Sequence, residues 1–375
     1  MAWVETLKLH NFRCYESATF NELRSGLIVL HGPNGAGKTN VLEALSILTP
    51  GRGLRSAKVM EIQKQNGDTP WAISSSVHND FGQTQVGTGL DPEKEKRVIR
   101  INGENARGQN ALAEHLACIW LTPQMDRLFL DSSRERRKFL DRMVFAFDPA
   151  HSGRVTRYEN AMRQRSKLLQ DESQKADVSW TTGLEKQMAE TGVAIAAARQ
   201  DFISRLQQAC EQHKTQHFPL AKLAAKGTLE ELLQNAPALE VEDMFLYQLG
   251  ASRAKDMVTG GAATGPHKSD LGVFYAEKDM AADQCSTGEQ KALLIGIILA
   301  HARLIEAERG SPPVLLLDEV AAHLDESRRA ALYTLLQDLG AQVWLTGTDR
   351  NLFETIEGQA QFFEIKDSAV HEIAA

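Results

Sequence analysis

Three short, continuous apolar runs indicate strands that are buried on both faces. They are LIVL at 27–30, VLLL at 314–317 and VWL at 343–345. The first run is too short for a helix and lies between Gly26 and Gly32, which favour turns. Strands of a parallel sheet covered on both faces read as continuous runs, whereas half-exposed strands alternate. We therefore expect buried strands near both ends of the chain, the last two being parallel.

The first 120 residues carry further strand signals around one helix. LKLHNF at 7–12 alternates like a strand. KRVIRINGENAR contains Asn102-Gly103, a dipeptide that tight hairpins prefer because both residues tolerate positive φ. A glycine-rich turn after the run at 27–30 leads into the helical stretch VLEALSIL. Residues 1–120 are therefore predicted to form a mixed sheet around one helix.

The middle of the chain, residues 121–258, has a helical pattern. Mostly apolar residues with heptad spacing are Leu184, Met188, Thr191, Ile195, Ala198 and Phe202, and the same period, with one polar gap, includes Val155, Tyr158, Met162 and Leu169. This pattern predicts two antiparallel helices in a short arm, the longer about 40 Å long at 1.5 Å per residue. Two ordinary helices packed on a globular lobe are the alternative. The α/β pattern returns over 259–375, so we expect an α/β domain that is split in sequence by a helical insertion.

Composition narrows the class of protein. The chain has 375 residues, of which 42% are hydrophobic, enough for about two domains. No stretch approaches the roughly 18 apolar residues that span a bilayer, and the start lacks the apolar core of a signal peptide. The four cysteines are scattered without metal-ligand spacing, which favours reduced thiols in a cytosolic protein. The net charge of −7 excludes a uniformly basic surface but leaves room for a local basic face.

The segment GPNGAGKT fits the phosphate-loop pattern G-x-x-x-x-G-K-[ST] in full and follows a predicted strand. Glycines let backbone N–H groups turn toward phosphates, and the next helix adds its positive end. We expect Lys38 to reach the β- and γ-phosphates of ATP and Thr39 to bind Mg²⁺. The predicted nucleotide contacts in this segment are Gly32, Pro33, Asn34, Gly35, Ala36, Gly37, Lys38, Thr39 and Asn40.

The segment VLLLDE supplies a second pair of candidates. The buried strand delivers Asp318 at its carboxyl end, where it would be the second Mg²⁺ ligand. Glu319 follows directly, and a carboxylate there can polarise a water in line with the γ-phosphate. Glu319 and Lys38 are therefore the predicted catalytic residues.

A second glycine-containing turn, QCSTGEQ, opens an apolar helix about 250 residues after the phosphate loop. Ser286 and Gly288 can cap their own helix, with Glu289 in its first turn. Alternatively, the turn completes the nucleotide site of a second subunit, so that ATP joins two copies and its hydrolysis separates them. In that second reading Ser286, Gly288 and Gln290 contact the nucleotide.

The order of these motifs resembles that of ABC-type ATPases. STGEQ resembles their signature motif, and AAHLD resembles their D-loop, with Asp325 crossing the dimer interface. Within that superfamily LKLHNFRCYESATF, GRGLRSAK and TGPHKSDL resemble segments of the RecF family, recombination mediators related to SMC heads. This resemblance implies an ABC-type ATPase head with an inserted helical lobe. It also implies a weak DNA-dependent ATPase that dimerises with ATP and is cytoplasmic and nucleoid-associated. Such a protein would bind single-strand/duplex junctions and help to load RecA, with RecR as partner.

Some positions depart from the family pattern. Thr348 stands where many ABC ATPases have a histidine that senses the γ-phosphate, so turnover is expected to be slow. Gln124 in LTPQMDRLF is a candidate contact to the γ-phosphate or Mg²⁺. Arg13, by likeness to SMC heads, is a candidate contact to the phosphates, and a surface arginine is the alternative.

Residues 134–167 form a basic segment with ten Lys/Arg and four Asp/Glu. Such a segment can follow a phosphate backbone, although a solvated helix face is the usual alternative. We predict DNA contacts by Arg136, Arg137, Arg163 and Arg165. The nucleotide-binding subunit of a membrane transporter would share the ATP motifs, but this basic insertion between them favours a DNA-binding protein.

Overall fold

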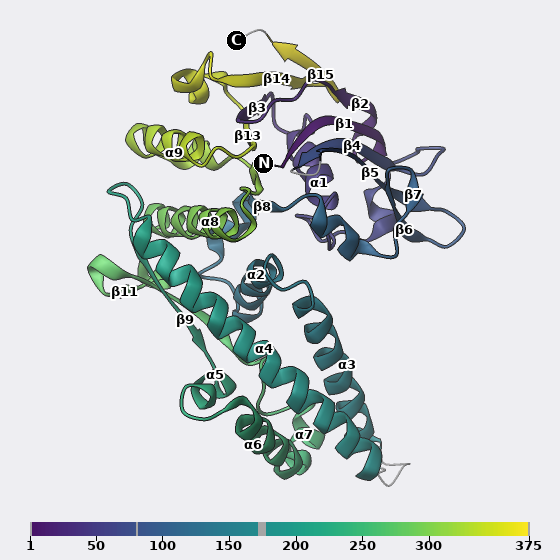
Figure 1. Ribbon diagram of the computed structural model, residues 1–375, viewed down its shortest axis with the longest axis vertical. Coiled ribbons are helices and arrows are strands. Elements are labelled where there is room, and N and C mark those ends of the chain that lie inside the picture. The colour runs from purple at the N-terminus through teal and green to yellow at the C-terminus, as the bar shows by residue number, and fades with distance from the viewer. Residues whose placement is uncertain (1, 80–81, 172–177, 374–375) are drawn as a thin grey trace. The chain divides into compact units, whose positions relative to one another are not determined.

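The computed structural model describes residues 2–79, 82–171 and 178–373 (Figure 1). The chain divides into two compact units. Unit 1 comprises Met1–Asp126, Thr215–Phe218 and Leu294–Ala375, and unit 2 comprises Arg127–Lys214 and Pro219–Leu293. The last junction, between residues 293 and 294, falls inside helix α8 (Thr287–Arg309). No helix within the described ranges combines the length and apolarity that a bilayer crossing needs.

Unit 1 contains a six-stranded sheet in the order β15-β14-β3-β13-β12-β8. Its strands are β3 (Leu27–His31), β8 (Cys118–Leu121), β12 (Val314–Leu317), β13 (Val343–Gly347), β14 (Ala360–Lys366) and β15 (Ala369–Ile373). All neighbours pair in parallel except β14 and β15. The three predicted buried runs are thus β3, β12 and β13, and every residue of these strands is buried.

A second six-stranded sheet in unit 1 is antiparallel, in the order β2-β1-β4-β5-β6-β7. Its strands are β1 (Trp3–Phe12), β2 (Tyr15–Phe20), β4 (Ala72–Asn79), β5 (Gly82–Asp91), β6 (Lys96–Ile101) and β7 (Glu104–Asn105). Asn102 (φ 51°) and Gly103 (φ 86°) form the predicted hairpin between β6 and β7. The prediction of one mixed sheet over 1–120 was wrong, because β3 and β8 pair with strands from the C-terminal third of the chain.

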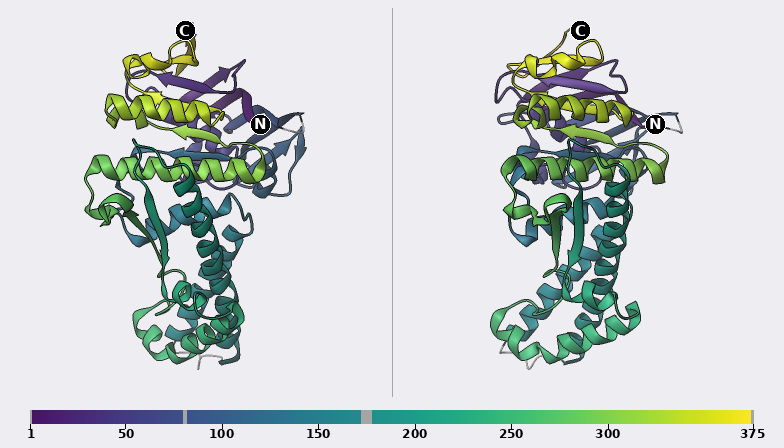
Figure 2. Two further views of the ribbon diagram at one scale, coloured as in Figure 1. Left: turned by 60° about the vertical axis from the view of Figure 1, so that its left-hand side comes forward. Right: turned by 90° about the vertical axis from the view of Figure 1, so that its left-hand side faces the viewer.

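Helix α1 (Lys38–Ile47) lies between the two sheets of unit 1. Its buried side chains share one hydrophobic core with the inner faces of both sheets, including Val41, Leu42, Trp71 and Trp344. The opposite face of the parallel sheet is covered by α9 (Glu326–Asp338) and the unit 1 part of α8 (Figures 1 and 2). Short 3-10 turns complete the unit, namely Val59–Ile62, Gln109–Glu114, Pro123–Arg127, Val320–His323 and Arg350–Ile356. The parallel sheet is therefore covered on both faces, which explains its continuous apolar strands.

Unit 2 is mostly helical. Its helices are α2 (Ser133–Phe145), α3 (His151–Gln170), α4 (Val178–Gln212), α5 (Thr228–Leu233), α6 (Ala238–Ala251) and α7 (Arg253–Thr259). Helices α3 and α4 pack along each other, as the heptad spacing predicted, with Leu184, Met188 and Ile195 buried. Helix α4 also packs against α5 and α6. The helical pair is therefore the spine of a lobe and is not a free-standing arm.

Unit 2 also contains a three-stranded antiparallel sheet, β11-β10-β9. Its strands are β9 (Ala221–Lys226), β10 (Asp270–Tyr275) and β11 (Met280–Ala281), and 3-10 turns follow at Ala276–Lys278 and Ala282–Gln284. The predicted boundary at 258/259 had assigned β10 to the ATPase domain. Pairing of Asp270–Tyr275 with Ala221–Lys226 instead keeps residues 259–293 in unit 2.

Candidate nucleotide-binding site

The carboxyl ends of four parallel strands in unit 1 bring the predicted ATP-binding residues together. The phosphate loop follows β3, Gln124 follows β8, Asp318 and Glu319 follow β12, and Thr348 follows β13. Backbone pairing joins these ends, since Gly347 lies opposite His31 and Leu317 opposite Leu121. Ligands of open α/β sheets bind outside the carboxyl ends of the strands.

The phosphate loop requires glycine at two positions. Gly32 has φ 148°, and a Cβ there would lie 2.1 Å from the carbonyl oxygen of Ile365. Gly37 has φ 116°, and a Cβ there would lie 2.6 Å from Oη of Tyr15. These positions exclude other residues, because an added side chain would meet fixed atoms. Helix α1 begins directly afterwards at Lys38, so its positive end faces the loop.

Lys38 is buried inside this loop. Its Nζ donates hydrogen bonds to the carbonyl oxygens of Gly32 (2.7 Å) and Pro33 (2.9 Å). Burial lowers the pKa of Lys38, and the negative charges of Glu319 and Asp318 partly oppose that shift. The ammonium group is therefore held at the loop and close to both acidic residues.

Thr39 and Asp318 form a hydroxyl–carboxylate pair. Oγ1 of Thr39 donates to Oδ1 and Oδ2 of Asp318 at 3.0 Å each, and Oγ1 of Thr346 donates to Oδ1 at 2.7 Å. Burial raises the pKa of Asp318, while the hydrogen bonds from Thr346 and Thr39 partly hold it down. Sequence reasoning missed Thr346. A hydroxyl residue inside the apolar run VWLTG was the available signal.

The donor set of this pair fits Mg²⁺, which prefers oxygen ligands. Within the described ranges no group of three His, Cys, Asp or Glu side chains is arranged to hold a metal ion. Thr39 and Asp318 can offer two oxygens, and Mg²⁺ usually takes its remaining ligands from substrate phosphates and water. The pair therefore fits a metal that binds together with a nucleotide.

Glu319 has an unusual backbone conformation. It has φ 53° and ψ 22°, the left-handed region that costs a non-glycine residue roughly 1–2 kcal/mol. Its N–H donates to Oγ1 of Thr346 at 2.9 Å. Because Thr346 also holds Asp318, one hydroxyl orients both acidic residues. Such strain at a cluster of polar groups is a feature of functional sites.

Gln124 and Thr348 are exposed at the same sheet edge. Gln124 lies in the 3-10 turn Pro123–Arg127, and Thr348 follows the last residue of β13. Neither side chain is fixed by a hydrogen bond to the described part of the protein. Both are therefore free to meet a ligand at this edge.

Arg13 is held by a buried carboxylate on α1. Its Nε and Nη2 donate to the two oxygens of Glu43 (2.8 and 2.5 Å), and Nη1 donates to the carbonyl oxygen of Glu61 at 2.6 Å. Arg55 also donates to Glu43 (3.0 Å) and to Oδ1 of Asn40 (2.7 Å). Sequence reasoning missed Arg55, although it lies in the quoted segment GRGLRSAK. The positive charge of Arg55 lowers the pKa of Asp318, so Arg55 acts on the acidic residues of the site.

The second glycine-containing turn lies in unit 2 and caps its own helix. The N–H and Oγ of Ser286 donate to Oε2 of Glu289 at 2.9 and 2.8 Å. Hydrogen bonds from Lys278 and then Ser286 lower the pKa of Glu289 to about 2. Ser286 and Gly288 are exposed. The turn therefore caps its own helix, which is the first of the two alternatives, and Gly288 and the Ser286 side chain remain at the surface.

Gln290 differs from its expected role. It is buried, with Nε2 donating to the carbonyl oxygen of Cys285 at 2.8 Å. The side chain thus supports the turn from inside, and the expectation of a direct nucleotide contact is corrected.

Asp325 is exposed at the start of α9, where Oδ1 accepts the N–H of Arg328 at 2.8 Å.

The predicted DNA contacts are partly wrong. Arg165 is fully buried and forms ion pairs with Glu185 (2.9 Å) and Asp256 (2.8 Å), so it cannot reach DNA. Arg136 forms a two-fold hydrogen-bonded pair with Asp270 at 2.8 and 2.6 Å, which neutralises its charge. The one polar gap in the period along α3 is Arg165, so the spacing already placed this side chain on the packed face, and the basic composition of the segment misled the prediction.

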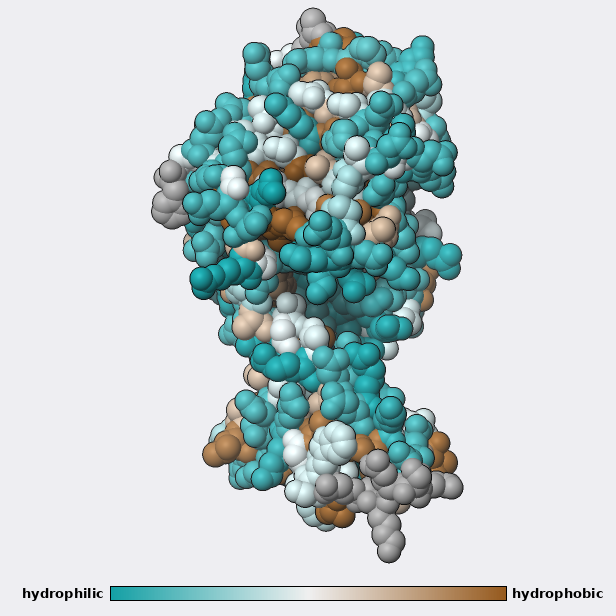
Figure 3. Space-filling model, turned by 90° about the vertical axis from the view of Figure 1, so that its right-hand side faces the viewer, coloured by the Kyte–Doolittle hydropathy of each residue, from teal (hydrophilic) through white to brown (hydrophobic). Residues whose placement is uncertain are grey.

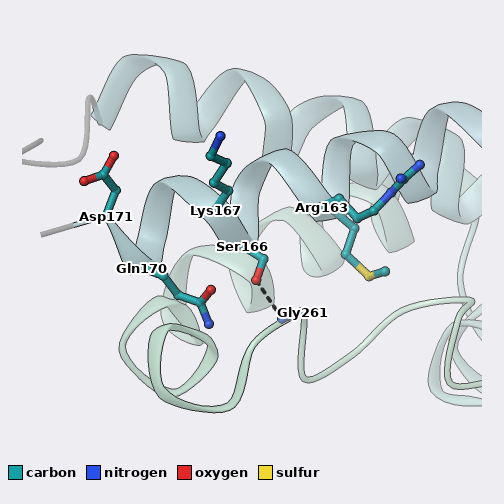
Figure 4. A pocket seen from close by; sticks show the side chains of 7 residues that line it. Arg163, Ser166, Lys167, Gln170, Asp171 and Gly261 are labelled. Carbon is teal, nitrogen blue, oxygen red and sulfur yellow. Dashed lines mark hydrogen bonds between the residues drawn. The ribbon is translucent and has the colours of Figure 1, made fainter.

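Arg163 and Arg137 remain accessible to different degrees. Arg163 is exposed and lines a cavity of about 470 Å³ (Figure 4). The other lining residues are Met162, Ser166, Lys167, Gln170, Asp171 and Gly261. Arg137 is half-buried and donates to the carbonyl oxygen of Ser269 at 2.6 Å.

Comparison with known proteins places this architecture in a family. A family model described as RecF/RecN/SMC N terminal domain matches residues 3–370. The chain is 46% identical over 370 residues to the DNA replication and repair protein RecF of Mesorhizobium japonicum, covering 98% of this chain and 97% of that protein. It is 42% identical over 367 residues to the protein of that name from Rhizobium meliloti, covering 97% of each.

Solved structures agree on the fold. The recombination mediator protein RecF-ATPrS in the RecFOR pathway has a TM-score of 0.88 at 22% identity, covering 100% of this chain and 98% of that one. The Smc head domain of Pyrococcus furiosus, bound to the C-terminal domain of ScpA, has a TM-score of 0.55 at 14% identity, covering 100% and 96%. From its sequence relatives and the family model, the chain belongs to the RecF family of the RecF/RecN/SMC group.

Proposed function

We propose that this chain is an ATP-hydrolysing, DNA-binding protein of replication and repair. The observation that carries the proposal is the pairing of Thr39 Oγ1 with both oxygens of Asp318, directly after a complete phosphate loop. The relatives that are more than 40% identical carry the name DNA replication and repair protein RecF, which supports the biological role.

The phosphate loop and its neighbours would bind ATP. The backbone of 32–37 and the positive end of α1 would hold the phosphates, and Lys38 would exchange the loop carbonyls for β- and γ-phosphate oxygens. Mg²⁺, when bound, neutralises charge on those oxygens. Thr39 and Asp318 would hold it, while Asn40, Arg13 and Gln124 are secondary candidates for contacts to the nucleotide or metal.

Glu319 would act as the general base. It would accept a proton from a water whose oxygen attacks the γ-phosphorus, while the bond to the β-phosphate oxygen breaks and ADP leaves. Thr346 would keep Glu319 and Asp318 in fixed relative positions through hydrogen bonds of 2.9 and 2.7 Å. Thr348 cannot donate and accept a proton as histidine does at neutral pH, so we expect slow turnover.

ATP would join two copies of the chain. In that dimer the exposed Ser286 and Gly288 of one copy would meet the γ-phosphate held by the other, and Asp325 would cross the interface. Ser286 would then give up its hydrogen bond to Glu289, a switch between two helix-capping partners. Hydrolysis would remove the γ-phosphate and release the dimer.

The DNA-bound dimer would act in recombination. We propose binding at single-strand/duplex junctions in the nucleoid, assistance to RecA loading, and RecR as a partner. The RecFOR pathway named for the structural relative supports this choice. A transporter subunit would not need the basic insertion of unit 2, and the relatives reported above are repair proteins and SMC heads.

The test is the mass of the protein in solution with and without ATP and Mg²⁺, measured by light scattering. We expect the wild type to double its mass with ATP. Lys38→Ala should remain monomeric because it cannot hold the phosphates, and Ser286→Arg should bind ATP yet remain monomeric. Glu319→Gln should form a dimer that persists, because hydrolysis is blocked.

Lys186→Ala is the matched control for Lys38→Ala, since it removes an exposed lysine on α4. It should dimerise like the wild type. ATP-driven dimerisation of Lys38→Ala would contradict the phosphate-loop role. Dimerisation of Ser286→Arg at wild-type ATP concentrations would contradict the contact between subunits.

A further inference from the structure

The segment TGPHKSD at 264–270 in unit 2 has no role in the nucleotide site. It is held by arginines from two helices. Arg199 on α4 donates to the carbonyl oxygen of Pro266 (2.7 Å), and Arg137 on α2 donates to that of Ser269 (2.6 Å). Arg136 pairs with Asp270 at the end of the segment. The segment is therefore fixed at three points along its length.

His267 and Gly265 add to this rigidity. Nε2 of His267 lies 3.0 Å from the carbonyl oxygen of Ala262, which can only accept, so Nε2 carries the proton. Nδ1 then accepts from Oη of Tyr158 at 2.8 Å. Gly265 has φ 139°, and a Cβ there would lie 2.2 Å from the same Tyr158 Oη. The backbone of the segment thus fits against Tyr158 with little freedom.

Lys268 is the exposed exception in this fixed segment. Its neighbours Pro266 and Ser269 are buried, whereas the side chain of Lys268 is exposed and has no hydrogen-bond or ion-pair partner in the described part of the protein. Holding a cation on a rigid backbone reduces the entropy lost when a ligand binds. The fixed backbone therefore presents one positive charge, that of Lys268, at the surface.

Two arginines of α2 add positive charge near the segment, although the negative charges of Asp270 and Asp141 also act on Arg137. Arg137 bonds a carbonyl of the segment, and Arg134 is exposed one helical turn earlier on the same face. No ion pair in the described ranges involves Arg134, Arg137 or Lys268, in contrast to Arg136 and Lys138. The charges of Lys268 and Arg137 both lower the pKa of His267, so both cations lie near that ring. We call Arg134, Arg137 and Lys268 the 268 platform.

The surroundings of the 268 platform favour a polyanion over an apolar protein partner. Large hydrophobic residues exposed in the described part of unit 2 include Leu239, Met244, Tyr247 and Val258, on α6 and α7. Figure 3 shows hydrophobic surface at the lower end, where Figure 1 places these helices. Leu130, just before α2, is also exposed, but no such residue lies in 132–138 or 264–270. Protein interfaces need an apolar centre, whereas phosphate contacts need cations and hydrogen-bond donors.

We propose that the 268 platform binds the phosphodiester backbone of nucleic acid, with Lys268 as the central contact. The proposal rests on the proposed DNA-binding function and specifies residues for it. It replaces the two arginines, Arg136 and Arg165, that the structure removes from the predicted DNA surface. Phosphate contacts of this kind fix register and affinity and carry no sequence preference.

The test is the affinity for a fluorescent duplex, measured by anisotropy at several salt concentrations with ATP present. Each lost phosphate contact should reduce the slope of log K against log salt by about 0.9 and weaken binding about fivefold near 0.15 M salt. We expect this for Lys268→Ala and Arg134→Ala, and nearly additive losses for the double variant. Lys268→Arg should retain binding. Both side chains are exposed, so thermal midpoints should not change.

Lys255→Ala, which removes an exposed lysine on α7, is the matched control and should bind like the wild type. Unchanged affinity and slope in the double variant, while the wild type binds, would overturn the platform alone. If Lys255→Ala loses as much duplex affinity as the platform variants, the loss follows from net charge alone and the proposal is wrong. A wild type that fails to bind DNA would overturn the proposed function as well.

Two further outcomes would assign the 268 platform a role other than binding nucleic acid. If polyglutamate of matched charge displaces the duplex equally well, the platform recognises acidic chains in general and the nucleic-acid assignment fails. If the double variant loses ATP-driven dimerisation but keeps its affinity for DNA, the cations serve the contact between subunits and the proposal is wrong.

Discussion

Replacing Arg165 by methionine separates a buried ion-pair network from a DNA-binding surface. Arg165 donates to Glu185, Asp256 and the carbonyl oxygen of Leu249 at 2.9, 2.8 and 2.6 Å. Methionine has a similar apolar stem but no donor. The substitution therefore removes every one of these hydrogen bonds while it keeps most of the packing.

The two carboxylates left behind differ in their remaining partners. Glu185 keeps Arg253, which donates to Oε1 and Oε2 at 2.9 and 2.5 Å. Burial alone raises the pKa of Glu185, but hydrogen bonds from Arg253 and Arg165 outweigh it and lower the pKa. Asp256 is fully buried and keeps Ser252 Oγ at 2.6 Å, but it loses its ion pair with Arg165. Most of the cost should therefore come from Asp256.

Removing one partner of a buried ion pair typically costs about 3–5 kcal/mol. We expect Arg165→Met to lower the free energy of unfolding of unit 2 by that amount. The assay is urea unfolding followed by far-UV circular dichroism, which reports mainly on this helical unit. Arg163→Met, two residues away on the exposed face of α3, should change stability by less than about 0.5 kcal/mol.

In duplex binding the two variants should rank in the opposite order, with a loss of affinity in Arg163→Met and none in Arg165→Met. At a temperature where Arg165→Met is folded, its affinity for DNA should match the wild type, since the side chain is buried. Arg163→Met should weaken binding, because Arg163 is exposed and the sequence predicts that it contacts DNA. A stable Arg165→Met that has lost DNA binding would refute the reasoning, because it would mean that the guanidinium reaches solvent.

Three other changes test the remaining parts of the structure. Thr346→Val should lower ATPase turnover at least tenfold and destabilise unit 1 by about 1–3 kcal/mol, because the N–H of Glu319 loses its buried acceptor. The control is Thr334→Val, which changes an exposed threonine on α9. Equal turnover in the two variants would contradict the role of Thr346. Burial lowers the pKa of His267 to about 4, below the usual value near 6.5, so the unfolded chain binds the extra proton first on acidification. The corresponding stability, up to about 3 kcal/mol, is present above pH 6.5 and lost as the pH falls toward 4. Urea midpoints at pH 7.5 and 5 should therefore differ less in His267→Gln than in the wild type or in exposed His213→Gln. Lys278→Ala should raise the pKa of Glu289 from about 2 toward its usual range, which a carboxyl NMR titration would detect; an unmoved titration would exclude the Lys278 contact.

The sequence by itself determined the parts that depend on neighbouring residues. A run of apolar residues specifies a strand covered on both faces, and β3, β12 and β13 are such strands. The spacing of glycine, lysine and threonine in the phosphate loop specifies a turn and a helix start, because φ and the first hydrogen bonds are local properties. Heptad spacing likewise specified which face of α4 packs against α3.

Only the tertiary structure decided which distant residues meet. Arg165 looked like part of a basic surface because its neighbours in sequence are basic. The spacing along α3 placed it on the packed face, but its partner Asp256 lies 91 positions later and could not be known before that contact formed. Thr346 attracted no attention because its importance depends on Asp318 and Glu319, which belong to another strand. The pairing of β9 with β10 likewise placed 259–293 in unit 2. Local patterns follow from the chain's own geometry, whereas burial and pairing of charges depend on which elements pack together.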